Sequence, residues 1–146
     1  MAAILGAIGF ERISPNVFAM PSGTVNFTGK TVILSDNPNM FYTSNTATLA
    51  LNFDTVSGEF RADGFTPDNP AQTPKTIEIE ANLTMDETDG TFQALNGTFV
   101  VNGTSASDVK VNGILATYTS AAAGYIVPSQ EVDDIIGGVF ILPQDR

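Results

Sequence analysis

Apolar and polar side chains alternate along much of this chain, which is the pattern of strands that bury one face. The clearest run is Thr76–Met85, in which odd-numbered positions from 77 to 85 are apolar and the even-numbered positions between them are polar. Ala47–Asp54 alternates in the same way, and Ser57–Gly58 then leads into a second alternating run, Glu59–Asp63. These two runs predict a hairpin with a short loop. Further strands are expected at 23–28, 31–34, 92–101, 109–118, 124–127 and 138–142.

The spacing of these runs predicts an all-β protein. About nine short strands, separated by turn residues at roughly ten-residue intervals, are typical of an antiparallel sandwich or barrel. Glycines interrupt several strand patterns, at positions 97, 113, 137 and 138, and indicate the bends that barrel corners need. We therefore expect a single antiparallel up-and-down barrel of about eight strands. We expect its interior to be filled by Leu49, Leu51, Phe53, Phe60, Ile77, Ile79, Phe92, Phe99, Leu115 and Phe140.

The chain begins with its longest apolar run, MAAILGAIGF. A membrane-spanning helix takes about 20 apolar residues, so we expect no membrane span. Ile4, Leu5 and Ile8 have the spacing of a short helix that packs one face on the fold, although a strand or an assembly arm also fits the run. We therefore expect residues 1–19 to form an apolar arm or short helix and residues 20–146 to form the barrel domain.

The side chains that the chain lacks exclude several kinds of site. Its 146 residues contain no histidine and no cysteine, which excludes disulfides, thiolate zinc sites and histidine or cysteine nucleophiles. Acidic residues number 16 against 6 basic ones, and the net charge of −10 repels nucleic-acid phosphates and anionic membrane surfaces. The sequence has no Gly-x-Ser-x-Gly elbow, Walker loop or dinucleotide fingerprint. We therefore expect no nucleic-acid partner, no enzyme activity, no catalytic residues, no cofactor and no metal site.

Acidic residues that lie close together are the remaining candidates for chemistry. An enzyme that used Glu78 and Glu80 as an acid–base pair would need a cleft that separates their pKa values, and the alternation places both on the solvated face. Asp86, Glu87 and Asp89 offer oxygen ligands to Ca²⁺, but they lack the spacing of an EF-hand loop. The Asp-Gly dipeptide that follows favours an acidic hairpin turn.

Aromatic side chains near the predicted loops are the candidates for ligand binding. Met40, Phe41 and Tyr42 are three large side chains in succession, and consecutive residues of a strand face opposite sides, so at least one should point outward. Tyr118 and Tyr125 flank the small-residue stretch TSAAAG and are placed to line a barrel mouth. The alternative is that these rings close the core. We take Phe41, Tyr42, Tyr118 and Tyr125 as the candidate ligand-binding residues.

Several short motifs resemble a known family. Met20–Gly29 reads MPSGTVNFTG, and Ala47–Gly64 contains the pattern A-x-L-x-x-x-F-x-x-x-x-G-x-F. Later motifs are Gly-Thr-Phe at Gly97–Phe99, Val-Asn-Gly-Ile at Val111–Ile114 and Gly-Gly-Val-Phe at Gly137–Phe140. Their order resembles the C-terminal eight-stranded barrel shared by transferrin-binding protein B, factor H-binding protein and related bacterial transferrin-binding-protein-like solute-binding proteins.

The resemblance covers about residues 20–142 and implies a function as well as a fold. It implies a barrel that binds a host protein or a small solute through loops at the barrel ends, at the cell surface or outside the cell, without catalysis. We therefore expect a non-enzymatic binding module. The alternative is a structural or assembly subunit that oligomerises through the N-terminal apolar arm, and the oligomeric state is left open between the two.

Overall fold

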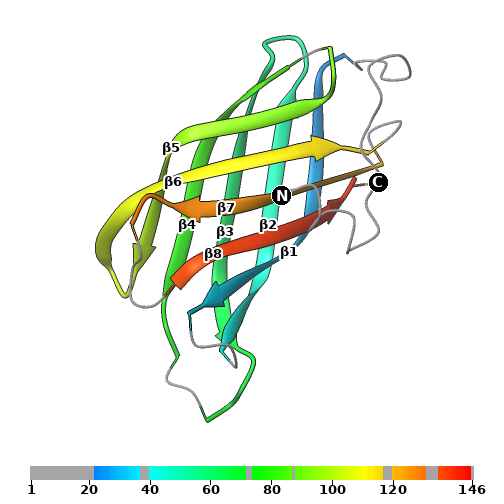
Figure 1. Ribbon diagram of the computed structural model, residues 1–146. Coiled ribbons are helices and arrows are strands. Elements are labelled where there is room, and N and C mark those ends of the chain that lie inside the picture. The colour runs from blue at the N-terminus through cyan, green and yellow to red at the C-terminus, as the bar shows by residue number, and fades with distance from the viewer. Residues whose placement is uncertain are drawn as a thin grey trace.

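The structure, a computed structural model, describes residues 22–36, 40–71, 74–86, 88–116, 120–130 and 135–145. These residues form eight antiparallel strands that pair in sequence order, and β1 also pairs with β8 to close a barrel (Figure 1). The predicted all-β, up-and-down barrel is therefore confirmed. The strands are β1 (Thr24–Ser35), β2 (Phe41–Asn52), β3 (Ser57–Pro67), β4 (Ile77–Met85), β5 (Thr91–Val101), β6 (Thr104–Leu115), β7 (Ala121–Pro128) and β8 (Ile135–Pro143).

The predicted N-terminal arm or short helix, residues 1–19, lies outside the described residues. The division of the chain into an arm and a barrel domain therefore stays a prediction. Within the described ranges, no helix is long and apolar enough to cross a membrane.

Closure gives the barrel two ends, which we call the lower rim and the upper rim after their places in Figure 1. The lower rim carries the connections β1–β2, β3–β4, β5–β6 and β7–β8, and the upper rim carries the connections between the other consecutive strands. Both ends of the described chain lie toward the upper rim, where Asp145 N donates a hydrogen bond to Asn26 O (2.8 Å). The loops of the lower rim therefore lie at the opposite end of the barrel from Ser22 and Asp145, where the described chain starts and ends.

The strand boundaries extend the predicted ones at the start of the barrel. The two short runs predicted before residue 35 form one strand, β1. β2 begins at Phe41 rather than at the predicted Ala47, because Phe41 pairs with Leu34 of β1. The predicted hairpin of β2 and β3 is confirmed, with Asn52 paired with Ser57 beside the turn.

Paired strands β2 and β3 change the direction of their side chains part-way along. Buried positions of β2 are even-numbered at Tyr42 and Ser44 and odd-numbered from Ala47 onward. The two residues between them, 45 and 46, are both exposed, and so are their neighbours 63 and 64 on β3. Gly64 has a φ of +66° and lies against the side chain of Asn45. A glycine at this position therefore permits the switch in side-chain direction along β2 and β3.

Aromatic rings fill the middle of the barrel, and each inward side chain predicted from the sequence is buried. The rings of Phe60 and Phe140 lie with their centroids 4.8 Å apart, and those of Phe92 and Phe140 lie 6.3 Å apart. Gly113 and Gly124 pair with each other between Phe92 and Phe140. A Cβ on Gly113 would lie 2.3 Å from Phe92 Cζ, so these glycines leave room for the rings, where the sequence predicted only a bend at Gly113.

Gly124→Ala should therefore destabilise the barrel. The added methyl would lie 2.1 Å from Asn112 O and 2.7 Å from Phe140 Cζ, so the backbone or the ring must move. Overpacking of this kind costs about 1–3 kcal/mol or more, and urea denaturation measures it. Thr98→Ser, a conservative change at an exposed position, is the control. An unchanged midpoint for Gly124→Ala would show that this close packing is not required.

Two buried hydroxyl groups in the described part of the barrel have no hydrogen-bond partner: Thr31 Oγ1 and Tyr42 Oη. Thr31 is nevertheless tied to its neighbour strand, because its backbone N donates to Ser44 Oγ (2.8 Å). An unpaired buried hydroxyl costs free energy, whereas an apolar group of the same shape does not.

Thr31→Val should raise the free energy of unfolding by about 1 kcal/mol, because it replaces the unpaired hydroxyl with a methyl group. Ser44→Ala is the matched control in the same cluster. It removes the acceptor for the Thr31 amide and should lower stability by roughly 1–3 kcal/mol. Thermal and urea denaturation test both variants. A clear loss of stability in Thr31→Val would mean that its hydroxyl is bonded after all.

Candidate binding surface

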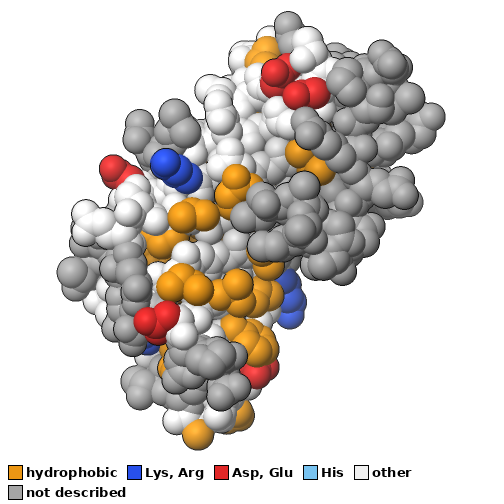
Figure 2. All heavy atoms as spheres, viewed as in Figure 1, with side chains coloured by type: hydrophobic (Ala, Val, Ile, Leu, Met, Phe, Trp, Pro, Cys, Tyr) orange, Lys and Arg blue, Asp and Glu red, His pale blue; other side chains and the backbone are white. Residues whose placement is uncertain are grey.

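The outer surface of the barrel has two unlike faces. The outward positions of β3 and β4 are polar and exposed, as at Glu59, Arg61, Glu78 and Glu80. The outward positions of β7, β8 and the last part of β1, at Val32 and Leu34, are largely apolar. Figure 2 shows hydrophobic side chains gathered across the strands that lie at the front of the barrel. The apolar face is the candidate binding surface.

Pairing across neighbouring strands brings the apolar side chains together. Tyr125 of β7 pairs with Val139 of β8, which pairs with Val32 of β1. Leu34 of β1 pairs with Phe41 of β2, and paired residues point to the same side of a sheet. We call the whole set the outer apolar face, and its members are Val32, Leu34, Phe41, Ile114, Ala123, Tyr125, Val127, Ile136, Val139 and Ile141.

The most exposed members of this face lie on three neighbouring strands. Among the described residues, the large apolar side chains that are exposed are Leu34 (39%), Val127 (39%), Ile136 (48%) and Ile141 (40%). They belong to β1, β7 and β8, which are adjacent in the barrel. Exposed apolar side chains that gather on neighbouring strands make this face a candidate interaction surface.

Two of the four predicted site residues lie on this face. Phe41 and Tyr125 are half-buried and point outward beside Leu34 and Val139. Tyr125 lies in the middle of β7, so it lines neither a barrel mouth nor the core.

Of the other two predicted site residues, the structure describes only Tyr42, which does not lie on this face. Tyr42 points into the barrel and its side chain is fully buried, while Lys75 Nζ lies 5.8 Å from its ring centroid. Tyr42 therefore closes the core near the lower rim, which is the alternative that the sequence left open for it. Tyr118 lies outside the described residues, so its role stays a prediction.

The sequence analysis missed most of the outer apolar face. β8, with the sequence IIGGVFILP, buries Ile135, Phe140 and Leu142 and also presents Val139 and Ile141 outward. Such a continuous apolar run signals a strand with two apolar faces, and it breaks the alternation on which the prediction relied. The run itself was the signal that could have located this surface.

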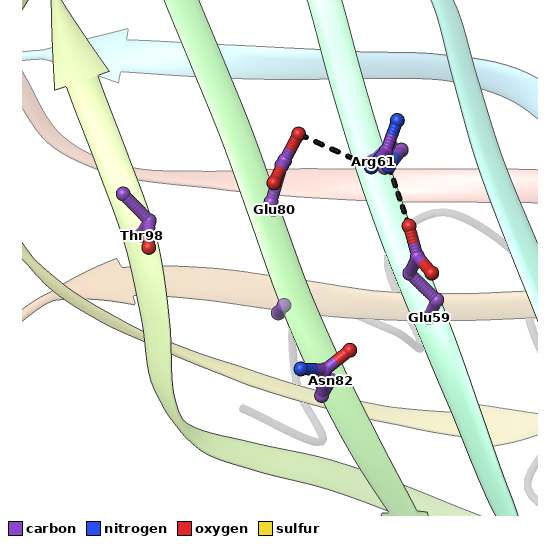
Figure 3. Close-up of a pocket in the computed structure, with 6 residues that line it drawn as sticks. Glu59, Arg61, Glu80, Asn82 and Thr98 are labelled. Atoms are coloured by element: carbon purple, nitrogen blue, oxygen red, sulfur yellow. Dashed lines mark hydrogen bonds and ion pairs between the residues drawn. The ribbon is translucent and has the colours of Figure 1, made fainter.

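The polar face carries a shallow depression bordered by Glu59, Arg61, Glu80, Asn82 and Thr98 (Figure 3). Arg61 Nε donates a hydrogen bond to Glu59, and Arg61 Nη2 lies 3.4 Å from Glu80 Oε1. The hydrogen bond with Glu59 and the charge of Glu80 raise the pKa of Arg61 above its ordinary value. All three side chains are about half exposed or more, so water screens these ion pairs and they contribute little. The carboxylates thus form surface pairs with one arginine.

In the acidic turn after β4, the carboxylates of Asp86 and Asp89 accept hydrogen bonds from residues of the same turn. Asp86 Oδ1 accepts hydrogen bonds from the amide and hydroxyl of Thr88, and Asp89 Oδ1 accepts from the amide and hydroxyl of Thr91. Gly90 completes the predicted Asp-Gly turn with a φ of +74°. Across the described ranges, no three acidic, histidine or cysteine side chains are grouped to hold a metal ion.

Comparison with known proteins identifies the fold. No family model matches the sequence, and no curated protein matches it. The barrel is similar to the crystal structure of a double mutant of the vaccine antigen transferrin-binding protein B from Haemophilus parasuis Hp5, with a TM-score of 0.60. This protein has a transferrin-binding protein B-like barrel. The match has 15% sequence identity and covers 92% of this chain but only 27% of that protein. The similarity is therefore to one part of the Haemophilus parasuis protein.

The acidic turn of this transferrin-binding protein B-like barrel should have a measurable pH dependence. The hydrogen bond from the Thr88 hydroxyl lowers the pKa of Asp86 below its ordinary value of 3.8. The contribution of the ionised Asp86 to the stability of the folded state is therefore fully present above pH 3.8. It is lost as the pH falls through the pKa of Asp86 in the folded state. The stability difference between wild type and Asp86→Asn should shrink between about pH 7 and pH 2 in urea titrations. Thr88→Val should remove part of the same dependence, and a difference that stays constant with pH would contradict the assignment.

Proposed function

We propose that this protein is a non-enzymatic binding module that recognises a protein partner through its outer apolar face and the adjoining lower rim. The observation that carries the proposal is the gathering of exposed apolar side chains on β1, β7 and β8. The structurally similar protein is named for binding a protein, transferrin, which supports the same class of function. By the same likeness we propose that the module works at the cell surface or outside the cell.

The shape of the barrel favours a protein over a small solute. Small molecules bind in concave pockets that enclose most of their surface. An eight-stranded barrel is only wide enough for side chains or for one small ligand, and here Phe60, Phe92 and Phe140 occupy the middle of the interior. The outer apolar face is an open sheet surface, which suits the broad contact of a protein interface.

Phe41 and Tyr125 are the aromatic anchors in this proposal. Aromatic residues supply much of the binding energy at protein interfaces, because they bury a large rigid surface. Phe41 follows the β1–β2 connection and so joins the lower rim to the outer apolar face. Lys30 pairs with Ile141 and Lys110 pairs with Val127, so two basic side chains border the apolar patch. A partner with apolar groups bordered by carboxylates would match this surface.

Binding measurements with surface variants test the proposal. Purified wild type is immobilised and tested against transferrin and against fractionated host serum by biolayer interferometry. Leu34→Ser combined with Val127→Ser should weaken any specific binding by tenfold or more, because these side chains lie in the patch. Glu78→Gln combined with Thr98→Ser alters the opposite, polar face and should leave binding unchanged.

Two results would overturn the proposal. The first is a specific partner whose affinity is unaffected by the Leu34→Ser and Val127→Ser changes. The second is a wild-type dimer, detected by size-exclusion chromatography with light scattering, that these changes convert to a monomer. That second result would make the outer apolar face an interface between copies and would favour the assembly subunit.

A further inference from the structure

We propose that Asn102 is a site of spontaneous deamidation, at which the folded protein converts an asparagine side chain to a carboxylate without an enzyme. The site lies in the turn between β5 and β6, at the lower rim (Figure 1). The conversion adds a negative charge to that rim and loosens the contact between the turn and the start of β4. The inference rests on the geometry of the turn and is independent of the proposed binding function.

Asn102 and Gly103 form the whole turn between β5, which ends at Val101, and β6, which begins at Thr104. Val101 pairs with Thr104, and φ is positive at both turn residues, +53° at Asn102 and +75° at Gly103. Asn-Gly is a preferred pair for a two-residue hairpin turn of this kind, because both positions need a left-handed backbone. The local fold thus favours the two residues whose adjacency also makes an asparagine reactive.

The reaction joins the backbone of Gly103 to the side chain of Asn102. Gly103 N loses its proton to base and attacks Asn102 Cγ, so that a C–N bond forms, the Cγ–Nδ2 bond breaks and Nδ2 leaves as ammonia. Water then opens the resulting succinimide ring at either carbonyl group, which yields aspartate or isoaspartate. The net reaction consumes water, releases ammonia and needs no oxidant, reductant or cofactor. Glycine favours the attack because it has no side chain to crowd the nitrogen.

Both reacting groups are accessible in the folded barrel. Asn102 and Gly103 are exposed, and a Cβ added at Gly103 would meet no atom within 4 Å. Within the described ranges, Gly103 N donates no hydrogen bond and Asn102 Nδ2 has no partner. The attacking nitrogen and the leaving group are therefore both open to water, which takes a proton from the first and supplies one to the second.

Asn102 also connects the turn to the residue before β4. Its N donates to Thr76 O (2.7 Å), and its Oδ1 accepts from Thr76 N (3.0 Å). An aspartate at this position keeps the acceptor oxygen. An isoaspartate instead carries the main chain through the former side chain, which adds a methylene group to the backbone of the turn. Because both hydrogen bonds need the present turn geometry, isoaspartate formation should release the Thr76 amide.

The other Asn-Gly pairs of the chain provide an internal comparison. Asn112-Gly113 lies within β6, where Gly113 pairs with residues of both neighbouring strands. Asn96-Gly97 lies within β5. A backbone amide inside a sheet takes part in the ladder of hydrogen bonds, so it is not free to turn back on the preceding side chain. The fold, rather than the dipeptide alone, therefore selects Asn102.

Peptide mapping by mass spectrometry tests the site in the full-length folded protein. Wild type is incubated at mildly alkaline pH, digested at acidic pH, and scored for conversion at Asn96, Asn102 and Asn112. Conversion at Asn102 should be several-fold faster than at the other two asparagines and should rise with pH, because Gly103 N must lose a proton. In the matched control, the same chain unfolded in urea, the three sites should convert at similar rates because glycine follows each of them.

Two results of this experiment would overturn the proposal. The first is equal conversion at Asn102 and Asn112 in the folded protein. The second is a folded protein that retains Asn102 over a period in which the unfolded chain reacts.

A second measurement tests the effect on the turn. Anion exchange separates the deamidated fraction by its added negative charge, and an isoaspartyl methyltransferase assay detects isoaspartate in it. Hydrogen exchange of the Thr76 amide should be several-fold faster in the isoaspartate fraction than in wild type. Asn102→Asp, which keeps the acceptor oxygen and the normal main chain, is the control and should exchange as wild type does. Unchanged exchange in the isoaspartate fraction would refute the loosened contact with β4.

Discussion

The close approach of β6 and β7 at Gly113 and Gly124 is the constraint on which this barrel depends. Without side chains at these two positions, Phe92 and Phe140 lie against the backbone, and Phe140 also packs on Phe60. The rings thereby fill the middle of a barrel that closes through the pairing of β1 with β8. Because the interior is occupied and closure leaves no free sheet edge, the proposed binding function has only the rims and the outer surface to use.

The outer surface of the barrel is polar on the side of β3 and β4 and apolar on the side of β7 and β8. Arg61 with Glu59 and Glu80 forms a hydrated, charged side, which contributes to the solubility expected of a protein with a net charge of −10. Tyr125, Val139 and the neighbouring apolar side chains form the other side. A surface that is uniform all round would have no preferred direction for contact, whereas the described strands are apolar on the side of β7, β8 and the end of β1.

Alternation along the sequence was sufficient to predict the class of fold and the inward side chains. In a strand with one solvent-exposed face, the apolar side chains recur at every second residue. It was insufficient where that premise fails. β8 is apolar on both sides, so no period distinguishes the inward Phe140 from the outward Val139 and Ile141. Likewise, Phe41 points outward and Tyr42 inward because β2 and β3 turn over together near Gly64. Alternation extended back from Ala47 would place Phe41 inward and Tyr42 outward, which is the reverse of their observed directions.

The hydrogen bond between Asp145 N and Asn26 O places the start of β1 beside the end of β8. A domain whose two chain ends emerge side by side can be inserted into a longer polypeptide or mounted on a tether without disturbing its sheet. In either arrangement the support attaches at one pole, and the opposite pole with Phe41 projects away from it. For a barrel held in either way, the β1–β2 connection before Phe41 would be among the parts farthest from the support.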